Sequence, residues 1–194
     1  MKNLTLLLLL LVAVNVQAQK ESIQLKNALV VGQLDKAEDR YSVEINLTEL
    51  LTEAGVKAIP SLNILKMGSD ASIIATDSIQ KLIAAKGIDT YILVSVRGYD
   101  KKFKKTHRKD ELKTALDAGN LFPIYRDEVV SVSFEFMFYR NGQFIGTDIV
   151  KCGNVSSRDT VIKRFRKSVA KRIEKSWTSL GLIGKEELDK SLRD

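Results

Sequence analysis

The sequence contains only one cysteine, one histidine and two prolines in 194 residues. A disulfide needs two thiols, so the lone Cys152 excludes an intrachain bridge and the fold must rest on its hydrophobic core. The lone His107 argues against a zinc site, because zinc ligands are mainly His and Cys. With 44% hydrophobic and 28% charged residues, the composition indicates neither disorder nor low complexity.

The sequence also lacks recognisable catalytic and cofactor motifs. The dinucleotide-binding pattern GxGxxG does not occur, and Gly98 and Gly142 belong to no phosphate loop. Cys152 and His107 are residue types that form a nucleophile pair, yet no local signature surrounds either of them. We therefore expect no cofactor, no metal ligands and no catalytic residues, and the sequence favours a protein that is not an enzyme.

Residues 1–18 have the features of a secretory signal peptide. Lys2 supplies an early positive charge, residues 4–14 form an apolar run, and Val16 and Ala18 suit the cleavage site. The apolar run is shorter than the about 20 residues that a membrane-spanning helix needs. We expect cleavage after Ala18 and an exported bacterial protein, periplasmic or secreted. An uncleaved membrane anchor is the alternative, and the lack of a nearby Cys argues against a lipid anchor.

The remaining chain has a length expected for one domain, and we find no internal repeat. We predict a short lead over residues 19–27, a single α/β domain over 28–183 and a charged tail over 184–194. No transmembrane span is expected in the mature chain. The sequence does not indicate an oligomeric state.

The formal net charge of +7 is unevenly distributed. Residues 97–109 contain seven basic residues and one acid, and residues 158–175 contain eight basic residues and two acids. The rest of the mature chain is net acidic. Charge patches of this kind give information about binding partners and solubility, and not about the fold.

Strands and helices are predicted to alternate over residues 28–96. A buried strand at 28–34 is followed by a turn-like segment at 35–39. A helix follows from Arg40 to Gly55, which buries Val43, Leu47, Leu50, Leu51 and Ala54. The next strand, at 56–65, contains Pro60, which places it at an edge or a bulge because proline donates no hydrogen bond.

The same pattern then repeats. Thr76 or Asp77 begins a short helix that ends at Gly87 and is expected to bury Ile79, Leu82 and Ile83. Residues 90–96 are apolar enough for a central strand. A basic loop and a short helical stretch, DELKTALDAG, come next.

A β-hairpin is predicted where two β-rich runs meet at Asn141-Gly142, the dipeptide of type I′ turns. A two-residue loop pairs Phe138 with Ile145, Phe136 with Thr147 and Phe134 with Ile149 on the core face. The other face then carries the pairs Tyr139 with Phe144, Met137 with Gly146, and Glu135 with Asp148.

The opposed Glu135 and Asp148 suggest two carboxylates for acid–base or metal chemistry. Like charges directly opposed on a sheet are destabilising. Either solvent and a nearby cation relieve them, or a bulge shifts the register. A catalytic site also needs a cleft and a third group, which the sequence does not indicate.

The stretch RDTVIKRFRKSVAKRIEKSWTSL, residues 158–180, predicts an amphipathic helix that begins at Ser156 or Ser157 and ends at Gly181. Its apolar stripe, within a 120-degree arc, is formed by Ile162, Phe165, Val169, Ile173, Trp177 and Leu180. The opposite face carries Lys163, Arg164, Lys167, Lys171 and Lys175. We interpret this segment as the last core helix, since a membrane-surface helix would leave the sheet uncovered. Arg166 falls inside the apolar arc and either reaches the rim or pairs with a hairpin carboxylate.

These elements predict an α+β or α/β fold with a single mixed β-sheet in the order β-α-β-α-β-β-β-α. That order, the export signal and the phrase GIDTYILVSVRG resemble a group of bacterial envelope proteins. The group comprises the amino-terminal domain of the Tol-system propeller protein, the curli-secretion lipoproteins and the lipoproteins that activate penicillin-binding proteins. The resemblance covers about residues 28–183 and implies a non-enzymatic envelope accessory domain. It carries over no functional residue.

Two basic segments form the candidate interaction patch, which comprises Lys101, Lys102, Phe103, Lys104, Lys105, Arg108, Lys109, Lys163, Arg164, Lys167, Lys171 and Lys175. An aromatic among lysines is a feature of single-strand binders, but export argues against nucleic acid. The expected partner is an envelope protein or an anionic envelope component, such as lipid phosphates or glycans. An enzyme acting on an anionic envelope substrate, a lipid- or glycan-binding protein and a merely solvated basic face are the alternatives.

Overall fold

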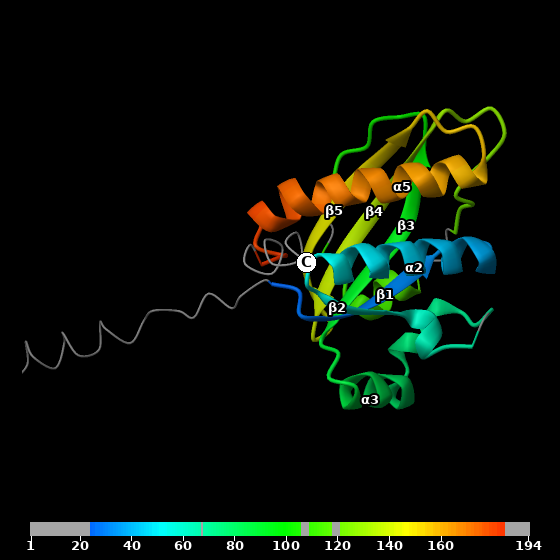
Figure 1. Ribbon diagram of the computed structural model, residues 1–194. Coiled ribbons are helices and arrows are strands. Elements are labelled where there is room, and N and C mark those ends of the chain that lie inside the picture. The colour runs from blue at the N-terminus through cyan, green and yellow to red at the C-terminus, as the bar shows by residue number, and fades with distance from the viewer. Residues whose placement is uncertain (1–23, 67, 106–108, 118–120, 185–194) are drawn as a thin grey trace, which may run out of the picture.

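Figure 1 shows a computed structural model that describes residues 24–66, 68–105, 109–117 and 121–184. The predicted signal peptide, His107, Arg108 and residues 185–194 of the predicted tail lie outside these ranges.

The described chain contains one mixed sheet of five strands in the spatial order β2-β1-β3-β4-β5. The strands are β1 (Asn27–Gln33), β2 (Lys57–Pro60), β3 (Thr90–Tyr99), β4 (Ser131–Arg140) and β5 (Gln143–Gly153). The first three lie parallel, whereas β4 and β5 run antiparallel to their neighbours. The predicted fold class, the central position of β3 and the edge position of Pro60 are therefore confirmed.

Helices cover both faces of this sheet. Helices α2 (Ala37–Glu53) and α5 (Arg158–Arg172) pack on one face, which includes the phenylalanines of β4 (Figure 1). Helices α3 (Asp77–Ala85) and α4 (Leu112–Leu116) contribute to a second apolar cluster on the opposite face. Because β3 is buried on both faces, its sequence is a nearly continuous apolar run.

Helix α2 begins earlier than predicted. Residues 37–39, predicted as a turn, form its first turn, in which Glu38 and Asp39 place negative charge at the positive end of the helix dipole. The apolar residues predicted for this helix are buried. The following strand ends at Pro60, and a 3-10 turn over Ser61–Asn63 replaces the rest of the predicted strand.

Helix α3 buries less than predicted. Ile83 is buried and Ile79 is half-buried, but Leu82 is 43% exposed. This helix lies at one side of the sheet, next to the 3-10 turn Ala71–Ala75. Only one face of α3 therefore contacts the rest of the protein, and Leu82 lies outside that face.

The predicted hairpin register is wrong beyond its first pairs. Tyr139 faces Phe144 as predicted, with ring centroids 5.7 Å apart. A β-bulge at Ile145 then shifts the register by one residue, so that Phe138 faces Gly146 and Phe136 faces Asp148. Further along, Glu135 faces Ile149 and Phe134 faces Val150.

The bulge moves Asp148 to the other face of the strand. Because side chains alternate, one extra residue turns Asp148 toward the core face and Ile149 away from it. The three phenylalanines of β4 are buried together as predicted, but Ile149 is only half-buried and does not join them. The shift separates the two carboxylates that a regular hairpin would place opposite each other, which removes a destabilising like-charge pair.

Helix α5 begins at Ser157, where Ser157 and Thr160 form a reciprocal capping box. Val161, Phe165, Val169, Ile173 and Trp177 are buried, while Ile162 is half-buried. A π-helical turn over Ile173–Trp177 follows the regular helix. It changes the angle per residue, so the predicted stripe ends early and Leu180 is 52% exposed. Gly181 has a φ of 75° and ends the helix as predicted.

Candidate functional site

The outward face of α5 and of the π-helical turn after it carries a row of exposed lysines. Lys163, Lys167, Lys171 and Lys175 are all exposed, and Arg164 is half-buried beside them. Within the described chain, none of these five side chains forms an ion pair. We refer to the four lysines as the lysine row.

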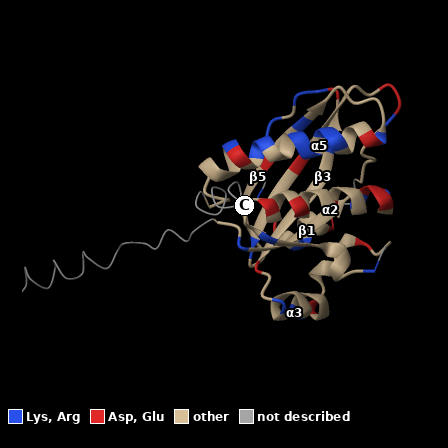
Figure 2. Ribbon diagram, viewed as in Figure 1, with Lys and Arg blue, Asp and Glu red and all other residues tan. Residues whose placement is uncertain are grey.

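The arginines on the side of α5 that faces α2 have a structural role. Arg158 pairs with Asp39, and Arg166 pairs with Glu49 and, at 3.6 Å, with Glu53. Arg166 also donates a hydrogen bond to Asn46 at 3.0 Å. Its partners therefore come from α2 rather than from the hairpin. Figure 2 shows the result, with acidic residues on α2 and basic residues on α5.

The second basic segment follows β3. Lys101, Lys102, Lys104 and Lys105 are exposed. Phe103 is half-buried, and its ring lies against Gly98, where a Cβ would come within 2.5 Å of the ring. Gly98 has a φ of 150°, so both its conformation and the space it leaves allow the ring to anchor the segment.

Asp148 connects this segment to α5. The carboxylate is buried, and its Oδ1 accepts a hydrogen bond from the backbone N–H of Ile149 at 2.9 Å and forms an ion pair with Lys105 Nζ at 3.0 Å. Its Oδ2 accepts from Trp177 Nε1 at 2.9 Å and lies 3.3 Å from Arg172 Nε. The bulge in β5 therefore places one carboxylate between two cations from distant segments.

Arg172 is held by further contacts. Its guanidinium donates to the carbonyl of Ile149 at 3.0 Å and to the hydroxyl of Ser176 at 3.3 Å. Both backbone polar groups of Ile149 are thus occupied by side chains, the N–H by Asp148 and the C=O by Arg172. Since β5 pairs with a strand on one side only, these contacts cover the middle of an open sheet edge.

A groove of about 280 Å³ lies at this edge. We call it the edge groove, and its lining residues are Lys102, Phe103, Lys105, Ser133, Asp148, Ile149, Lys151 and Arg172. Four of them are cations and one is an acid. Lys102 and Lys151 form no ion pair within the described chain. The edge groove is therefore strongly positive even after Asp148 is counted.

The structure brings together only part of the predicted patch. Lys102, Phe103 and Lys105 meet α5 at the edge groove, whereas Lys109 lines a separate pocket near Asn141 at the hairpin turn. Arg108 lies outside the described residues. Sequence reasoning missed Lys151 and Arg172 as site residues. Arg172 could have been included because it lies within the basic stretch 158–175. Nothing in the sequence around Lys151 distinguishes it from other surface lysines.

The proposed carboxylate pair does not form. Glu135 lies on the opposite side of its strand from the buried phenylalanines, and its Oε2 is 3.8 Å from Arg97. Burial raises the pKa of Glu135, and the charge of Arg97 partly opposes that shift. Asp148 lies on the phenylalanine side, so the two acids cannot act on one substrate atom.

Cys152 is fully buried in the core beneath α5. Burial raises the pKa of its thiol to about 12, an effect that a hydrogen bond with Ser168 reduces. A thiol in this environment is almost entirely protonated at neutral pH, and the thiolate is the reactive form. Cys152 therefore lacks the features of a catalytic nucleophile.

We expect Cys152 in the folded protein to resist a maleimide reagent at neutral pH. The expected result is little modification over a time in which the urea-unfolded chain reacts completely, measured by mass spectrometry. The unfolded sample is the control for reagent quality. Folded protein that reacts as fast as unfolded protein would show that the thiol is accessible.

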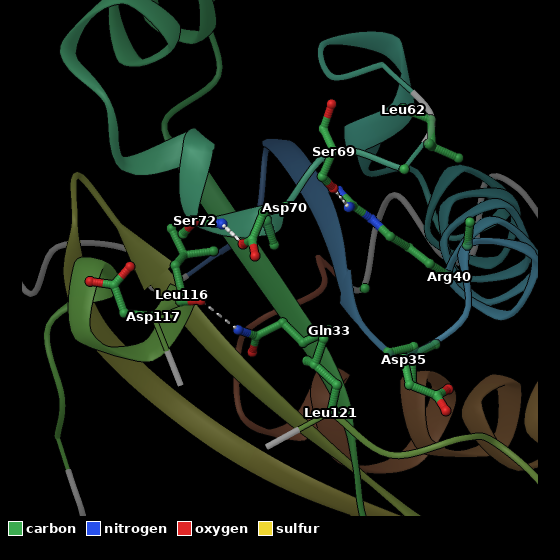
Figure 3. Close-up of a pocket in the computed structure, with 15 residues that line it drawn as sticks. Gln33, Asp35, Arg40, Leu62, Ser69, Asp70, Ser72, Leu116, Asp117 and Leu121 are labelled. Carbon is green, nitrogen blue, oxygen red and sulfur yellow. Dashed lines mark hydrogen bonds between the residues drawn. The ribbon is translucent and has the colours of Figure 1, made fainter. Parts of the chain in front are cut away.

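A separate pocket of about 350 Å³ lies at the carboxyl end of β1, which is where ligands commonly bind in parallel sheets (Figure 3). Its polar lining includes Gln33 and Arg40, together with the exposed Asp35, Asp70 and Asp117. The hydrogen bond from Ser72 N–H, at 2.7 Å, lowers the pKa of Asp70. The pocket is therefore acidic at neutral pH.

The buried polar groups of this pocket are engaged within the protein. Arg40 pairs with Glu44 at 2.9 Å and donates to the hydroxyl of Ser61 and to the carbonyl of Ser69. Gln33 donates to the carbonyls of Ala115 and Leu116. The described residues include no group of three or more His, Cys, Asp and Glu side chains that could hold a metal ion. We consider this pocket structural, and the edge groove the better candidate site.

A scan against protein-family models finds no match, and a search of curated proteins finds none either. Among solved structures, the chain is similar to the lipoprotein GNA1162 from Neisseria meningitidis, with 19% identity and a TM-score of 0.41. That alignment covers 78% of this chain and 99% of the lipoprotein.

It is also similar to the PelC dodecamer from Paraburkholderia phytofirmans in two crystal forms. The identity is 10% and the TM-scores are 0.42 and 0.40, with 77% of this chain and 88% of that chain covered. Similarities this distant transfer no function or assembly state to this chain. Membership of the envelope groups that the sequence resembles stays a prediction.

In the part of the chain that the structure describes, no helix has the length and apolar character needed to cross a membrane.

Proposed function

We propose that this protein is a non-enzymatic binding module of the bacterial cell envelope that docks on an anionic membrane surface. The lysine row of α5 carries the proposal, because its four charges are exposed and unpaired while the arginines facing α2 are paired. The predicted signal peptide supports an envelope location.

The shape of the basic surface favours an extended partner. Lysines spaced along α5 and the π-helical turn after it present point charges in a line, which suits a charged surface better than one small ligand. Anionic lipids attract such clusters by about 1 kcal/mol for each basic residue near the surface. The apolar stripe of α5 stays in the core, so docking would rest on charge and not on insertion of the helix.

The alternative of an enzyme has less support. Among the described residues that line the edge groove, there is no His, Cys or Glu, and both oxygens of Asp148 accept hydrogen bonds. A substrate bound there would meet cations but no available base. The groove therefore favours binding over catalysis.

We expect the variant K163Q/K167Q/K171Q/K175Q to lose up to about a thousandfold in affinity for vesicles of phosphatidylglycerol and phosphatidylcholine. Co-sedimentation at low salt would measure this change. Wild-type binding should weaken steeply with added salt, because exposed charges are screened.

The matched control is K26Q/K57Q/K81Q/K86Q, which removes four exposed lysines from other surfaces, including the opposite sheet edge at β2. This control should bind nearly as well as the wild type. If wild-type protein does not bind the anionic vesicles, docking on a membrane surface is wrong. An equal loss in both variants would mean that only total charge matters.

A further inference from the structure

The edge groove differs from the lysine row in being concave and built from distant segments. Lys102 and Lys105 come from the segment after β3, Lys151 from β5 and Arg172 from α5. Figure 2 shows basic residues gathered on α5 and on the chain beside β5. Cations that converge on one small space suit a single compact anion more than a diffuse surface charge.

Two of these cations are held in place before any ligand binds. Asp148 fixes Lys105 at 3.0 Å and Arg172 at 3.3 Å, and it is itself held by Trp177. A guanidinium has five N–H donors, so Arg172 keeps donors for a ligand beyond those used by Asp148, Ile149 and Ser176. Preorganised cations lose less freedom on binding than flexible ones.

The charge balance of the groove favours a dianion. Asp148 offsets one of the four cations, which leaves an excess of three positive charges among the lining residues. A phosphomonoester carries nearly two negative charges at neutral pH and three acceptor oxygens, whereas a phosphodiester carries one charge. The groove can therefore distinguish the two by charge and by the number of oxygens.

The size and walls of the groove restrict what can enter. Its volume of about 280 Å³ lies just below the range of pockets that enclose drug-sized ligands, so it suits a headgroup rather than a polymer. The ring of Phe103, fixed against Gly98, and the side chain of Ile149 give it an apolar wall. The hydroxyl-bearing Ser133 also lines it.

We propose that the edge groove binds the phosphomonoester group of a lipid headgroup, through Lys102, Lys105, Lys151 and Arg172. This rests on the proposed function and adds selectivity to it. The lysine row attracts any anionic surface, and the groove selects the surface that displays monoesters.

The test compares phosphatidylcholine vesicles that contain phosphatidic acid, a monoester, with vesicles that contain phosphatidylglycerol, a diester, at equal total charge. Wild-type mature protein should bind the monoester vesicles at least about tenfold more tightly, because the second phosphate charge allows an extra charge-assisted contact in the groove. K102Q/K151Q should bind both vesicles equally. These two lysines are exposed and unpaired, so the variant should fold.

The matched control K163Q/K167Q carries the same charge change on the lysine row. It should weaken binding to both vesicles and keep the monoester preference. Wild type that binds both vesicles equally would overturn the groove proposal and leave the proposed function standing. A preference that persists in K102Q/K151Q would also overturn the groove proposal.

A second measurement tests the groove without any membrane. Inorganic phosphate, titrated into the labelled protein, should shift the backbone amide signals of Ile149 and Lys151, and K102Q/K151Q should abolish the shift at Ile149. If no vesicle binds but these shifts occur, the proposed membrane function fails and the groove site stands. Shifts confined to other surfaces would overturn the groove site.

Discussion

Phe165→Ala is expected to lower the free energy of unfolding by about 3 to 5 kcal/mol, the range for a large-to-small change in a core. Phe165 is fully buried. Its ring lies edge-to-face with Phe134 at 4.9 Å and stacks with Phe136 at 6.1 Å. The truncation therefore removes aromatic contacts between α5 and β4 and leaves a cavity. Urea denaturation followed by circular dichroism would measure the change.

Leu180→Ala is the control, because Leu180 is 52% exposed at the end of the same region. A surface change of this kind should alter stability by about 0.5 kcal/mol or less. A loss well below about 1 kcal/mol for Phe165→Ala would mean that α5 does not dock on the sheet. The position of the lysine row on the folded protein would then no longer be established.

Glu44→Ala is expected to destabilise the protein by about 3 to 5 kcal/mol, because it leaves a buried cation without its partner. Glu44 is fully buried and pairs with Arg40 at 2.9 Å. It also accepts hydrogen bonds from the backbone of Gly32 at 2.8 Å and from the hydroxyl of Ser61 at 2.7 Å. These contacts tie α2 to β1 and to the 3-10 turn after β2. Urea denaturation would again provide the measurement.

Glu49→Ala is the matched control on the same helix. Glu49 pairs with Arg166 at the surface, where its side chain is 52% exposed. Exposed ion pairs contribute about 0 to 1 kcal/mol, so this variant should remain close to wild type. Equal losses of stability in Glu44→Ala and Glu49→Ala would contradict the idea that burial of the ion pair determines the cost of removing its carboxylate.

Local patterns in the sequence predicted the element order well. The Asn141-Gly142 turn, the caps at Ser157 and Gly181 and the apolar periodicity each depend on neighbouring residues. The structure contains the corresponding turn, caps and core positions. Such short-range features can be recognised because the residues that determine each of them are close together in the sequence.

The register beyond the turn could not be predicted by counting from the turn. A two-residue loop sets the pairing only while both strands stay regular, and Ile145 interrupts β5. Gly146 in a strand and the expected opposition of Glu135 and Asp148 were signals of a bulge. These two features indicate that the hairpin contains a bulge, but they do not identify the residue at which the bulge occurs.

The edge groove was beyond sequence reasoning for a different reason. Each basic segment was recognised by its composition, but their meeting depends on Asp148, which was expected on the other face. Contacts between Lys105 and Arg172 through Asp148 join residues far apart in the chain. Local patterns contain no information about such a junction.

The contacts of Ile149 have a consequence for self-association. An open strand of 11 residues such as β5 is a template on which a second chain can add, and that is a common start of aggregation. Here Asp148 and Arg172 already occupy both backbone groups of Ile149, which an incoming strand would need in the middle of this edge, and the exposed Lys151 adds a charge beside them. These contacts therefore oppose the addition of a strand at the centre of β5 when many copies are concentrated on one surface.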